Sequence, residues 1–179
     1  MTRFNNEQLL ESPDFPFHLA IYPFQPGEAV PPHSHEFIEF VYVTGGTGTH
    51  TYRGSEYPIG EGDVFVIEPD AEHAYQTGAA DPLVVYNILV APALVSYELQ
   101  TLSKVASFVD FFYVEPFLRE SAQFQSHLKL RPHERLEMRQ LLERILEEYR
   151  EKRLGYRILV KTRLIEMLVF LSRCYSGTL

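Results

Sequence analysis

The sequence predicts a mainly β protein, a small β-barrel or double-sheet jelly roll, followed by an antiparallel pair of helices. Up to about residue 92 the chain is rich in Val, Ile, Phe, Tyr, Thr, Gly and Pro, in short runs broken by turn residues, which is typical of many short strands. After that point the apolar residues recur with a period near 3.6, which is typical of helices. We therefore divide the 179 residues of one structural domain into a barrel region (1–92), a connecting segment (93–131) and a helical pair (132–179).

The strands of the barrel region are expected where β-branched and aromatic residues alternate with polar ones. Glycine-containing turns separate several of them: "TGGTG" (44–48), which we interpret as a hairpin turn, "RGSE" (53–56) and "GEGD" (60–63). The predicted strands are 17–24, 37–43, 47–53, 63–67, 73–77 and 83–90.

The first long helix is "PHERLEMRQLLERILEEYREKRLG" (132–155). Pro132 suits a first helical turn, and Gly155 suits the position after the last. A second helix (156–175) is apolar around most of its circumference, so we expect it to be buried on more than one side. Shorter helices are expected in "SKVASFVDFF" (103–112) and "PFLRES" (116–121). The apolar stripe of the first helix consists of Met138, Leu141, Leu142, Ile145 and Tyr149.

Part of this apolar surface is expected to lie exposed and to join two copies of the chain. The second helix, with Met138, Leu142, Ile145 and Tyr149, would then form the seam of a two-fold homodimer. The alternative is that the stripe packs wholly within the chain, against residues 93–131. Sedimentation of the isolated chain distinguishes the two.

Bulk properties exclude several classes of protein. The net charge of −8 argues against nucleic-acid binding by this chain itself, because phosphate contacts need clustered Lys and Arg. The one cysteine, Cys174, cannot form an internal disulfide and is expected to be a buried apolar residue. No apolar run is long enough for a membrane span, and the first residues do not resemble a signal peptide, so a cytoplasmic location is expected.

Three potential metal ligands stand close together in "GEAVPPHSHEFIEFVYVTGG" (27–46). If this stretch forms one strand, His33, His35 and Glu39 share a face and point into the barrel. His73, at the start of a later strand, is a fourth candidate. Two imidazoles and a carboxylate, with or without a third imidazole, can hold Zn, Ni, Mn or Fe and leave positions open for a small molecule.

The spacing of these residues resembles the first signature motif of the cupin superfamily, with every position filled from Gly27 to Gly46. Segment 62–73 is similar to the second cupin motif but departs from it. Pro69 stands four residues before His73, where the superfamily has five, and Thr77 stands where an asparagine is expected.

These departures point to a narrower family, because "GDVFVIEPDAEHAY" (62–75) resembles the second motif as it appears in the effector-binding domain of AraC-family transcription regulators. "FFYVEPFLRES", "FQSHLKL" and "LSRCYS" are similar to segments of the sugar-responsive members, and the resemblance covers about residues 17–176. It implies a cupin-like jelly-roll barrel that binds a small effector, and a helical pair that dimerises. In that family a following segment with two helix-turn-helix units binds DNA. The sequence given does not contain it, so we expect a longer regulator rather than a stand-alone sensor.

Three hypotheses remain for His33, His35, Glu39 and His73. They bind a small polar effector such as a sugar, with or without a metal; they form a metal-dependent cupin enzyme, such as a dioxygenase or an isomerase; or they are inherited and satisfied by one another and by water. We adopt the first, without catalysis, because no separate acid, base or nucleophile is indicated. Tyr75 and Thr77 have the same strand parity as His73, so they are expected to contact the effector.

Overall fold

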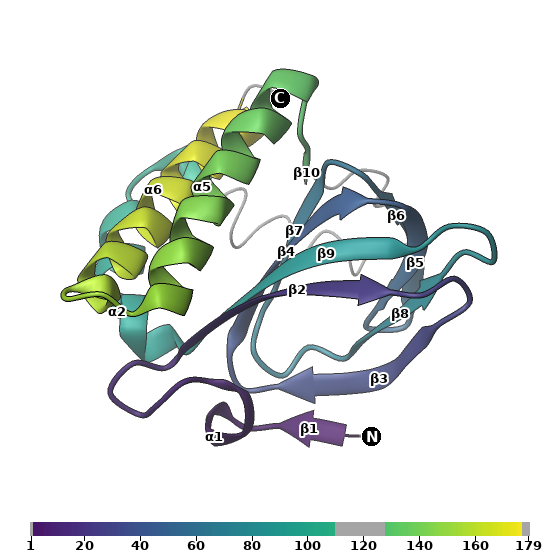
Figure 1. Cartoon of the computed structure of the whole chain (residues 1–179), viewed down its shortest axis with the longest axis horizontal. Helices are drawn as coiled ribbons and strands as arrows, with labels where there is room; N and C mark the ends of the chain where they lie inside the picture. The colour runs from purple at the N-terminus through teal and green to yellow at the C-terminus, as the bar shows by residue number, and fades with distance from the viewer. Residues whose placement is uncertain (1, 110–127, 177–179) are drawn as a thin grey trace.

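The computed structural model describes residues 2–109 and 128–176. Its two sheets face each other and enclose a barrel interior, and helices lie against one side (Figure 1). The mainly β architecture with C-terminal helices predicted from the sequence is therefore confirmed. The strands are β1 (Thr2–Phe4), β2 (Phe17–Phe24), β3 (Ala29–His35), β4 (Ile38–Gly45), β5 (Thr47–Tyr52), β6 (Ser55–Gly60), β7 (Asp63–Ile67), β8 (His73–Thr77), β9 (Leu83–Val90) and β10 (Leu128–Lys129).

The strand order separates the barrel into two walls. One sheet has the order β1-β3-β8-β5-β6, and the other has the order β10-β7-β4-β9-β2. Apart from the parallel pair β1–β3, the described pairings are antiparallel. Successive strands often belong to different sheets, so residues that are close in sequence face each other across the barrel.

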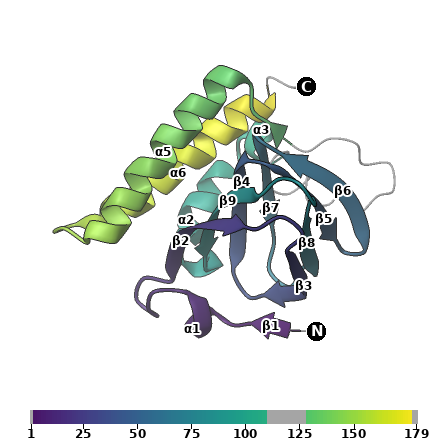
Figure 2. The same ribbon diagram turned by 45° about the vertical axis from the view of Figure 1, so that its right-hand side comes forward.

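The helices cover the outer face of the second sheet (Figure 2). These are α2 (Pro92–Leu102), α3 (Ala106–Val109), α5 (Pro132–Glu151) and α6 (Tyr156–Ser176), whereas α1 (Asn6–Leu9) lies apart near the N-terminus. Helices α5 and α6 run side by side as the antiparallel pair that the sequence predicts. No helix in the described residues is long and apolar enough to cross a membrane.

Because the second sheet is covered on both faces, its strands are apolar at successive positions. On β4, Phe40 and Tyr42 pack against the helices, whereas Val41 and Val43 face the barrel interior. All four side chains are almost wholly buried. Burial of each side chain contributes on the order of 1.5–3 kcal/mol to folding. A shift of β4 by one residue would lose this burial, so the register of β4 is fixed and Glu39 faces the barrel interior.

The structure corrects the interpretation of "TGGTG" as a hairpin turn. Strands β4 and β5 on either side of it belong to different sheets. Gly46, with φ of +80°, is the corner at which the chain crosses between the walls, and a Cβ there would lie 1.6 Å from the carbonyl oxygen of Pro82. Gly46 is therefore needed for a close backbone approach as well as for its positive φ.

The His-x-His segment and Glu39 do not share one strand, which corrects a second expectation. Strand β3 ends at His35, β4 begins at Ile38, and the two strands lie in opposite sheets. The pairing of β3 with β8 shifts register between Val30 and His33, where two prolines interrupt the ladder. The three side chains still face the interior, but they reach it from opposite walls.

The first long helix ends earlier than predicted. The left-handed residue is Lys152, with φ of 49°, so α5 stops at Glu151, and Gly155 lies instead just before α6. At the other end Arg131 precedes Pro132, and the Glu134 side chain accepts a hydrogen bond from the Arg131 backbone N–H. A short turn, from Lys152 to Gly155, therefore separates α5 from α6.

The apolar stripe of α5 is part of the core and not an exposed patch, which corrects the expected composition of a dimer seam. Met138, Leu142 and Ile145 are buried in the cluster between the helices and the second sheet. Tyr149 packs edge-to-face on Phe17 of β2, with ring centroids 5.1 Å apart. The large hydrophobic residues that stay exposed on these helices are Leu136, Ile158 and Leu159, with Leu154 in the turn.

Several elements were missed by the sequence reading. Strands β1, β3, β6 and β10 and helix α1 are short, polar or interrupted by proline, and helix α2 (Pro92–Leu102) was not predicted either. Helix α3 lies within the predicted "SKVASFVDFF", whereas "PFLRES" and the end of that first segment lie outside the described residues. Cys174 is buried as expected, and burial raises its pKa to about 12.

Candidate functional site

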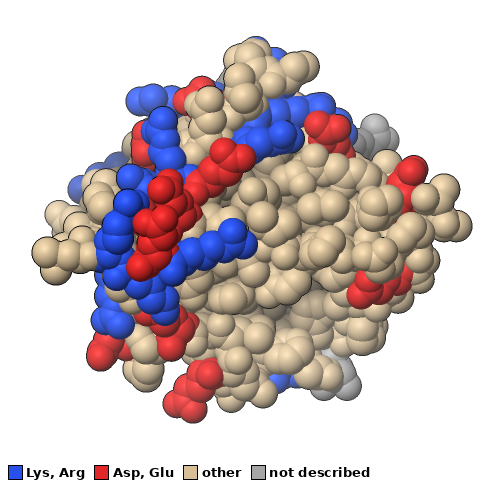
Figure 3. Space-filling model, in the orientation of Figure 1, with Lys and Arg blue, Asp and Glu red and all other residues tan. Residues whose placement is uncertain are grey.

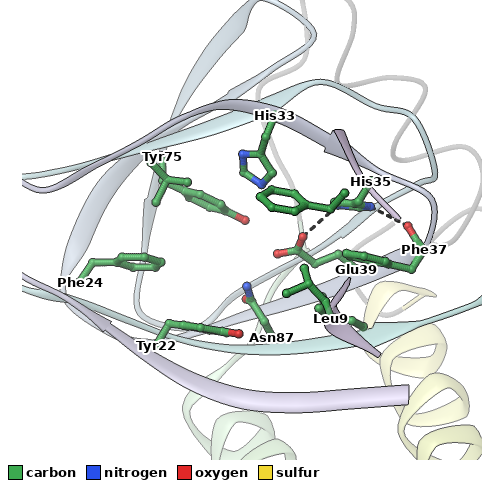
Figure 4. A pocket seen from close by; sticks show the side chains of 12 residues that line it. Leu9, Tyr22, Phe24, His33, His35, Phe37, Glu39, Tyr75 and Asn87 are labelled. Carbon is green, nitrogen blue, oxygen red and sulfur yellow. Dashed lines mark hydrogen bonds and ion pairs between the residues drawn. The ribbon is translucent and has the colours of Figure 1, made fainter. Parts of the chain in front are cut away.

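A cavity of about 190 Å³ opens into the barrel between the two sheets. Both walls contribute to it, and residues of the N-terminal segment, which crosses one end of the barrel, complete its lining (Figure 4). The described residues that line it are Phe4, Leu9, Tyr22, Phe24, Val30, His33, His35, Phe37, Glu39, Tyr75, Asn87 and Leu89.

A buried cluster of two imidazoles and one carboxylate stands at one end of this cavity, where His35 and Glu39 line it and His73, contrary to expectation, does not. The Nε2 atom of His35 lies 3.0 Å from an oxygen of Glu39, and that of His73 lies 3.5 Å from the same oxygen. The three ligand atoms lie within 4.8 Å of one another, and all three residues are buried. The first sheet positions the histidines at the ends of β3 and β8, and β4 supplies the carboxylate from the opposite wall.

Backbone carbonyls orient the imidazole rings. The Nδ1 of His35 donates to the carbonyl of Phe37 at 2.7 Å, and the Nδ1 of His73 donates to that of Ala71 at 3.2 Å. Because a carbonyl only accepts, Nδ1 must carry the hydrogen in each ring. The two Nε2 atoms are then directed at Glu39, and a cation is needed between each lone pair and the carboxylate. That cation is either a proton on the ring or a bound metal ion.

The charge state of Glu39 follows from the same contacts. Burial raises its pKa, but the hydrogen bonds and positive charge available from His35 and His73 outweigh burial, so the pKa is held far below its usual range. The carboxylate therefore stays ionised inside an apolar barrel. An ionised group at that depth persists only with partners, and these histidines are the partners.

This donor set fits a divalent transition metal. Each histidine has one nitrogen fixed by a carbonyl and the other turned toward the shared centre, which is the arrangement that orients histidine ligands in proteins. Two imidazoles and a carboxylate suit Zn, Ni, Mn or Fe. The residues that would hold the ion are His35, Glu39 and His73.

His33 stands beside this cluster and not within it. Its ring lies 4.1 Å from that of His73 between centroids, and its Nδ1 donates to the carbonyl of Pro31 at 2.9 Å. It is more exposed than the other two histidines and packs edge-to-face on Phe4. The structure thus places His33 at the rim of the cavity, and the quartet expected from the sequence becomes a trio with a neighbour.

Of the two further residues expected to contact an effector, the structure places one on the cavity wall. The hydroxyl of Tyr75 is directed into the cavity (Figure 4). Thr77 does not line the cavity, so the expectation for this residue was wrong. Its hydroxyl lies 2.7 Å from the carbonyl oxygen of Gln25 and 3.0 Å from that of Glu28. Two steps of the strand beyond His73 bring it to the far end of β8, where it holds the loop before β3.

Sequence reasoning missed Tyr22, Phe24 and Asn87. Phe24 is near-parallel to Tyr22 and to Tyr75, with ring centroids 6.2 and 6.1 Å apart, so three aromatic side chains form one wall. Burial and then the negative charge of Glu39 raise the pKa of Tyr22, which keeps its hydroxyl protonated. The only sequence signal was the asparagine within "LVVYNILV", a polar residue in an otherwise apolar strand.

Charged residues are sparse around this side of the barrel. In the orientation of Figure 1, Lys, Arg, Asp and Glu gather over the helices, and the barrel side is largely free of them (Figure 3). Among the described residues that line the cavity, Glu39 is the only Asp, Glu, Lys or Arg. The cavity therefore offers an acceptor, histidines, hydroxyl and amide groups and aromatic faces to a small molecule.

Comparison with known proteins gives a family match across most of the chain. A family model described as the AraC-like ligand binding domain matches residues 18–168. The HTH-type transcriptional activator RhaS of Klebsiella pneumoniae (strain 342) is 41% identical over 71 residues, which is 40% of this chain and 25% of that protein. RhaS of Enterobacter sp. (strain 638) is 38% identical over 71 residues, which is again 40% of this chain and 25% of that protein. The match thus spans about a quarter of the length of these relatives.

Solved structures of similar shape cover less than half of the chain. A cupin protein from Bacteroides fragilis is 26% identical with a TM-score of 0.40, over 42% of this chain and 65% of that one. The polyketide cyclase RemF from Streptomyces resistomycificus is 24% identical with a TM-score of 0.40, over 41% of this chain and 54% of that one.

Proposed function

The chain belongs to the family of AraC-like ligand-binding domains, and we propose that its barrel is the effector-sensing part of a transcription regulator. The observation that carries this proposal is the cavity itself, which is lined mainly by residues of the matched region and has polar groups at one end and aromatic faces at the other. Like the HTH-type transcriptional activators that it resembles, such a regulator would act in the cytoplasm.

The proposed effector is a small polar molecule, most simply a sugar. Aromatic faces such as that of Phe24 pack against the C–H groups of a sugar ring, and a few placed polar groups bind its hydroxyls. Glu39 accepts hydroxyl hydrogens, whereas the Tyr22 and Tyr75 hydroxyls can donate or accept. The cavity volume of about 190 Å³ suits one sugar ring and not an oligosaccharide.

This proposal predicts that a neutral monosaccharide stabilises the folded chain. A panel of pentoses, hexoses and deoxyhexoses at millimolar concentration should contain at least one member that raises the melting temperature in a concentration-dependent way, because a ligand that binds only the native state stabilises it. The sugar should be recovered chemically unchanged after long incubation with protein supplied with Fe(II) or Zn(II). No stabilisation by any member opposes the sugar effector, and multiple turnovers that stop in Glu39→Gln favour the alternative of a metal-dependent enzyme.

We also propose that His35, Glu39 and His73 hold a divalent transition metal, with His33 at the rim. The support is the three-atom cluster and the carbonyl-fixed Nδ1 atoms of both histidines. A bound ion would offer open coordination positions to effector hydroxyls. The chain's own contribution is to orient the imidazoles and to keep the carboxylate ionised in a dry site.

The N-terminal segment gives the effector site a physical link to the helices. Phe4 and Leu9 line the cavity, and Leu10 is buried against the base of the barrel. The next residue, Glu11, accepts a hydrogen bond from the Tyr156 hydroxyl at 2.5 Å and pairs with Lys152 at 3.1 Å, at the turn between α5 and α6. A ligand that repacks Phe4 or Leu9 would therefore shift the anchorage of this turn, and that is the proposed route of the signal.

The proposed homodimer uses the outer face of the helical pair, since the stripe on its inner face is core. A hollow on α5 and α6 is lined by His133, Leu136, Glu137, Gln140, Leu141, Arg144 and Glu166. Leu136 is 61% exposed there, and residues of both charge signs surround it. Two copies related by a two-fold axis can bury Leu136 and place Glu137 against Arg144, and a stable pair would need an interface on the order of 1,000 Å².

Leu136→Glu should convert this dimer into a monomer, because it places a charge at the centre of the apolar contact. Sedimentation velocity at micromolar concentration measures the change, with Tyr97→Glu on α2 as the control, since Tyr97 is 75% exposed and lies on another helix. Wild-type chain that sediments as a monomer, or a Leu136→Glu variant that stays dimeric, contradicts this interface.

A further inference from the structure

Asn87 is the one polar residue in the inward-facing row of β9. The other members of that row, Leu83, Val85 and Leu89, are buried apolar residues of the barrel interior. Asn87 is paired in register with Ala20 of β2 and Val41 of β4, so it stands in the middle of the second sheet. Nothing in the strand pairing requires an asparagine at this position, because backbone groups alone make the ladder.

Among the residues that the structure describes, the side-chain oxygen of Asn87 lacks a hydrogen-bond partner. Its Oδ1 is buried, and among the described residues no donor lies within hydrogen-bonding distance. A buried amide oxygen left unpaired opposes folding, and a leucine of nearly the same shape would fill this place without that penalty. The asparagine is therefore explained by something that enters the cavity and not by the stability of the empty barrel.

The amide lies where several polar groups converge. Asn87 is directed toward the carboxylate of Glu39, and the hydroxyls of Tyr22 and Tyr75 are directed into the same space (Figure 4). Phe24 and Leu9 supply apolar surface on either side of it. No lysine or arginine is present among the described lining residues, so an acidic ligand would meet Glu39 without a permanent positive charge to offset it.

We propose that Asn87 is a specificity-determining residue that recognises hydroxyl groups of an uncharged, polyhydroxylated ring. This inference deepens the proposed effector-sensing function and depends on it. A primary amide both accepts through Oδ1 and donates through Nδ2, so it can bind two neighbouring hydroxyls whose geometry fits. A ligand that lacks one of them leaves the buried amide unpaired, and such sites discriminate strongly against the deficient analogue.

Asn87→Leu tests this role because leucine has nearly the same shape as asparagine but forms no hydrogen bonds. Titration calorimetry with the neutral monosaccharide that stabilises wild type most should show binding weakened by about 10- to 100-fold. The melting temperature of the ligand-free variant should stay equal to that of wild type or rise. Monodeoxy analogues of the same sugar should sharpen the result: wild type should lose affinity for one or two of them, and Asn87→Leu should be indifferent at those positions.

Asn87→Ser, which keeps a smaller hydrogen-bonding group, should bind with intermediate affinity and an altered order of preference. Thr49→Val, a loss of one hydroxyl on the outer face of β5, is the matched control and should bind as wild type does. Unchanged affinity and unchanged preference in Asn87→Leu overturn this inference while the sugar-sensing function stands. A lower ligand-free melting temperature in both Asn87 variants assigns the amide to folding and also overturns it. If only acidic sugars, or no sugars, stabilise wild type, the inference fails together with the neutral sugar effector.

Discussion

Glu39→Gln should bind a divalent transition metal at least about 100-fold more weakly than the wild-type chain, since even residues that only orient metal ligands are worth 10- to 100-fold. The glutamine keeps the size of the side chain but removes the negative charge that His35 and His73 face at 3.0 and 3.5 Å. His35→Ala and His73→Ala should have effects of similar size because each removes one of the three ligand atoms. Titration calorimetry with Ni²⁺ or Zn²⁺ and elemental analysis after dialysis measure the change.

Two histidine variants serve as controls for this result. His133→Ala removes an exposed imidazole on α5 and should leave metal binding unchanged. His33→Ala, at the rim, should weaken it less than the loss of either clustered histidine. Equal metal content in wild type and in all three cluster variants would contradict metal binding by this trio.

Gly46→Ala should destabilise the fold by more than about 4 kcal/mol, or about 10 °C in melting temperature. The added Cβ would lie 1.6 Å from the Pro82 carbonyl oxygen and 2.7 Å from its carbon, and both atoms belong to backbone that cannot rotate away. The positive φ of +80° adds strain for a residue with a side chain. Thermal and urea unfolding followed by circular dichroism measure the loss.

The neighbouring residue gives a matched control for that substitution. Gly45 has nothing within 4 Å of an added Cβ and no positive φ, so Gly45→Ala should change stability by about 1 kcal/mol or less. Similar losses in both variants would contradict the interpretation of Gly46 as the corner between the two walls. A large loss at Gly46 alone supports it.

The barrel and the helical pair were predictable because each depends on a local repeat of apolar residues. Strands such as β2, β8 and β9 agree with their predicted bounds, since a buried face imposes its period on the sequence. Which sheet each strand joins is not a local property. "TGGTG" has the composition of a hairpin turn, and only the approach of Pro82 from a distant part of the chain makes Gly46 a corner.

The spacing of the histidines and Glu39 located the candidate site, although the strand arrangement that it assumed was wrong. His33, His35 and Glu39 were expected to point inward from one strand, yet they reach the cavity from two sheets. The chain crosses between the sheets at Glu36 and Phe37, and odd-numbered side chains face the interior both before and after this crossing. The assumption of a single strand therefore predicted the right orientation for side chains that belong to two strands. Asn87 and Tyr22 were not found, because their role depends on what lies across the barrel and not on their sequence neighbours.

The exposed patch on α5 was mispredicted for a related reason. A stripe such as Met138, Leu142 and Ile145 shows that one face is buried, but the pattern is the same whether the partner is the barrel or a second chain. Here the second sheet is that partner. To tell these two partners apart, one must know how much of the sheet is still uncovered, and the periodicity of a helix does not carry that information.

In the proposed function, an effector binds inside the barrel and acts on the N-terminal segment. Hydrogen–deuterium exchange on the wild-type chain, with and without the monosaccharide that stabilises it most, tests this directly. We expect slower exchange at the ends of β3 and β8, in residues 2–11, and at the turn from Lys152 to Tyr156, because cavity and turn are joined through Glu11. Protection confined to the outer hollow of α5 and α6, or binding without any protection of β3, β8 or residues 2–11, would contradict an effector site in the barrel.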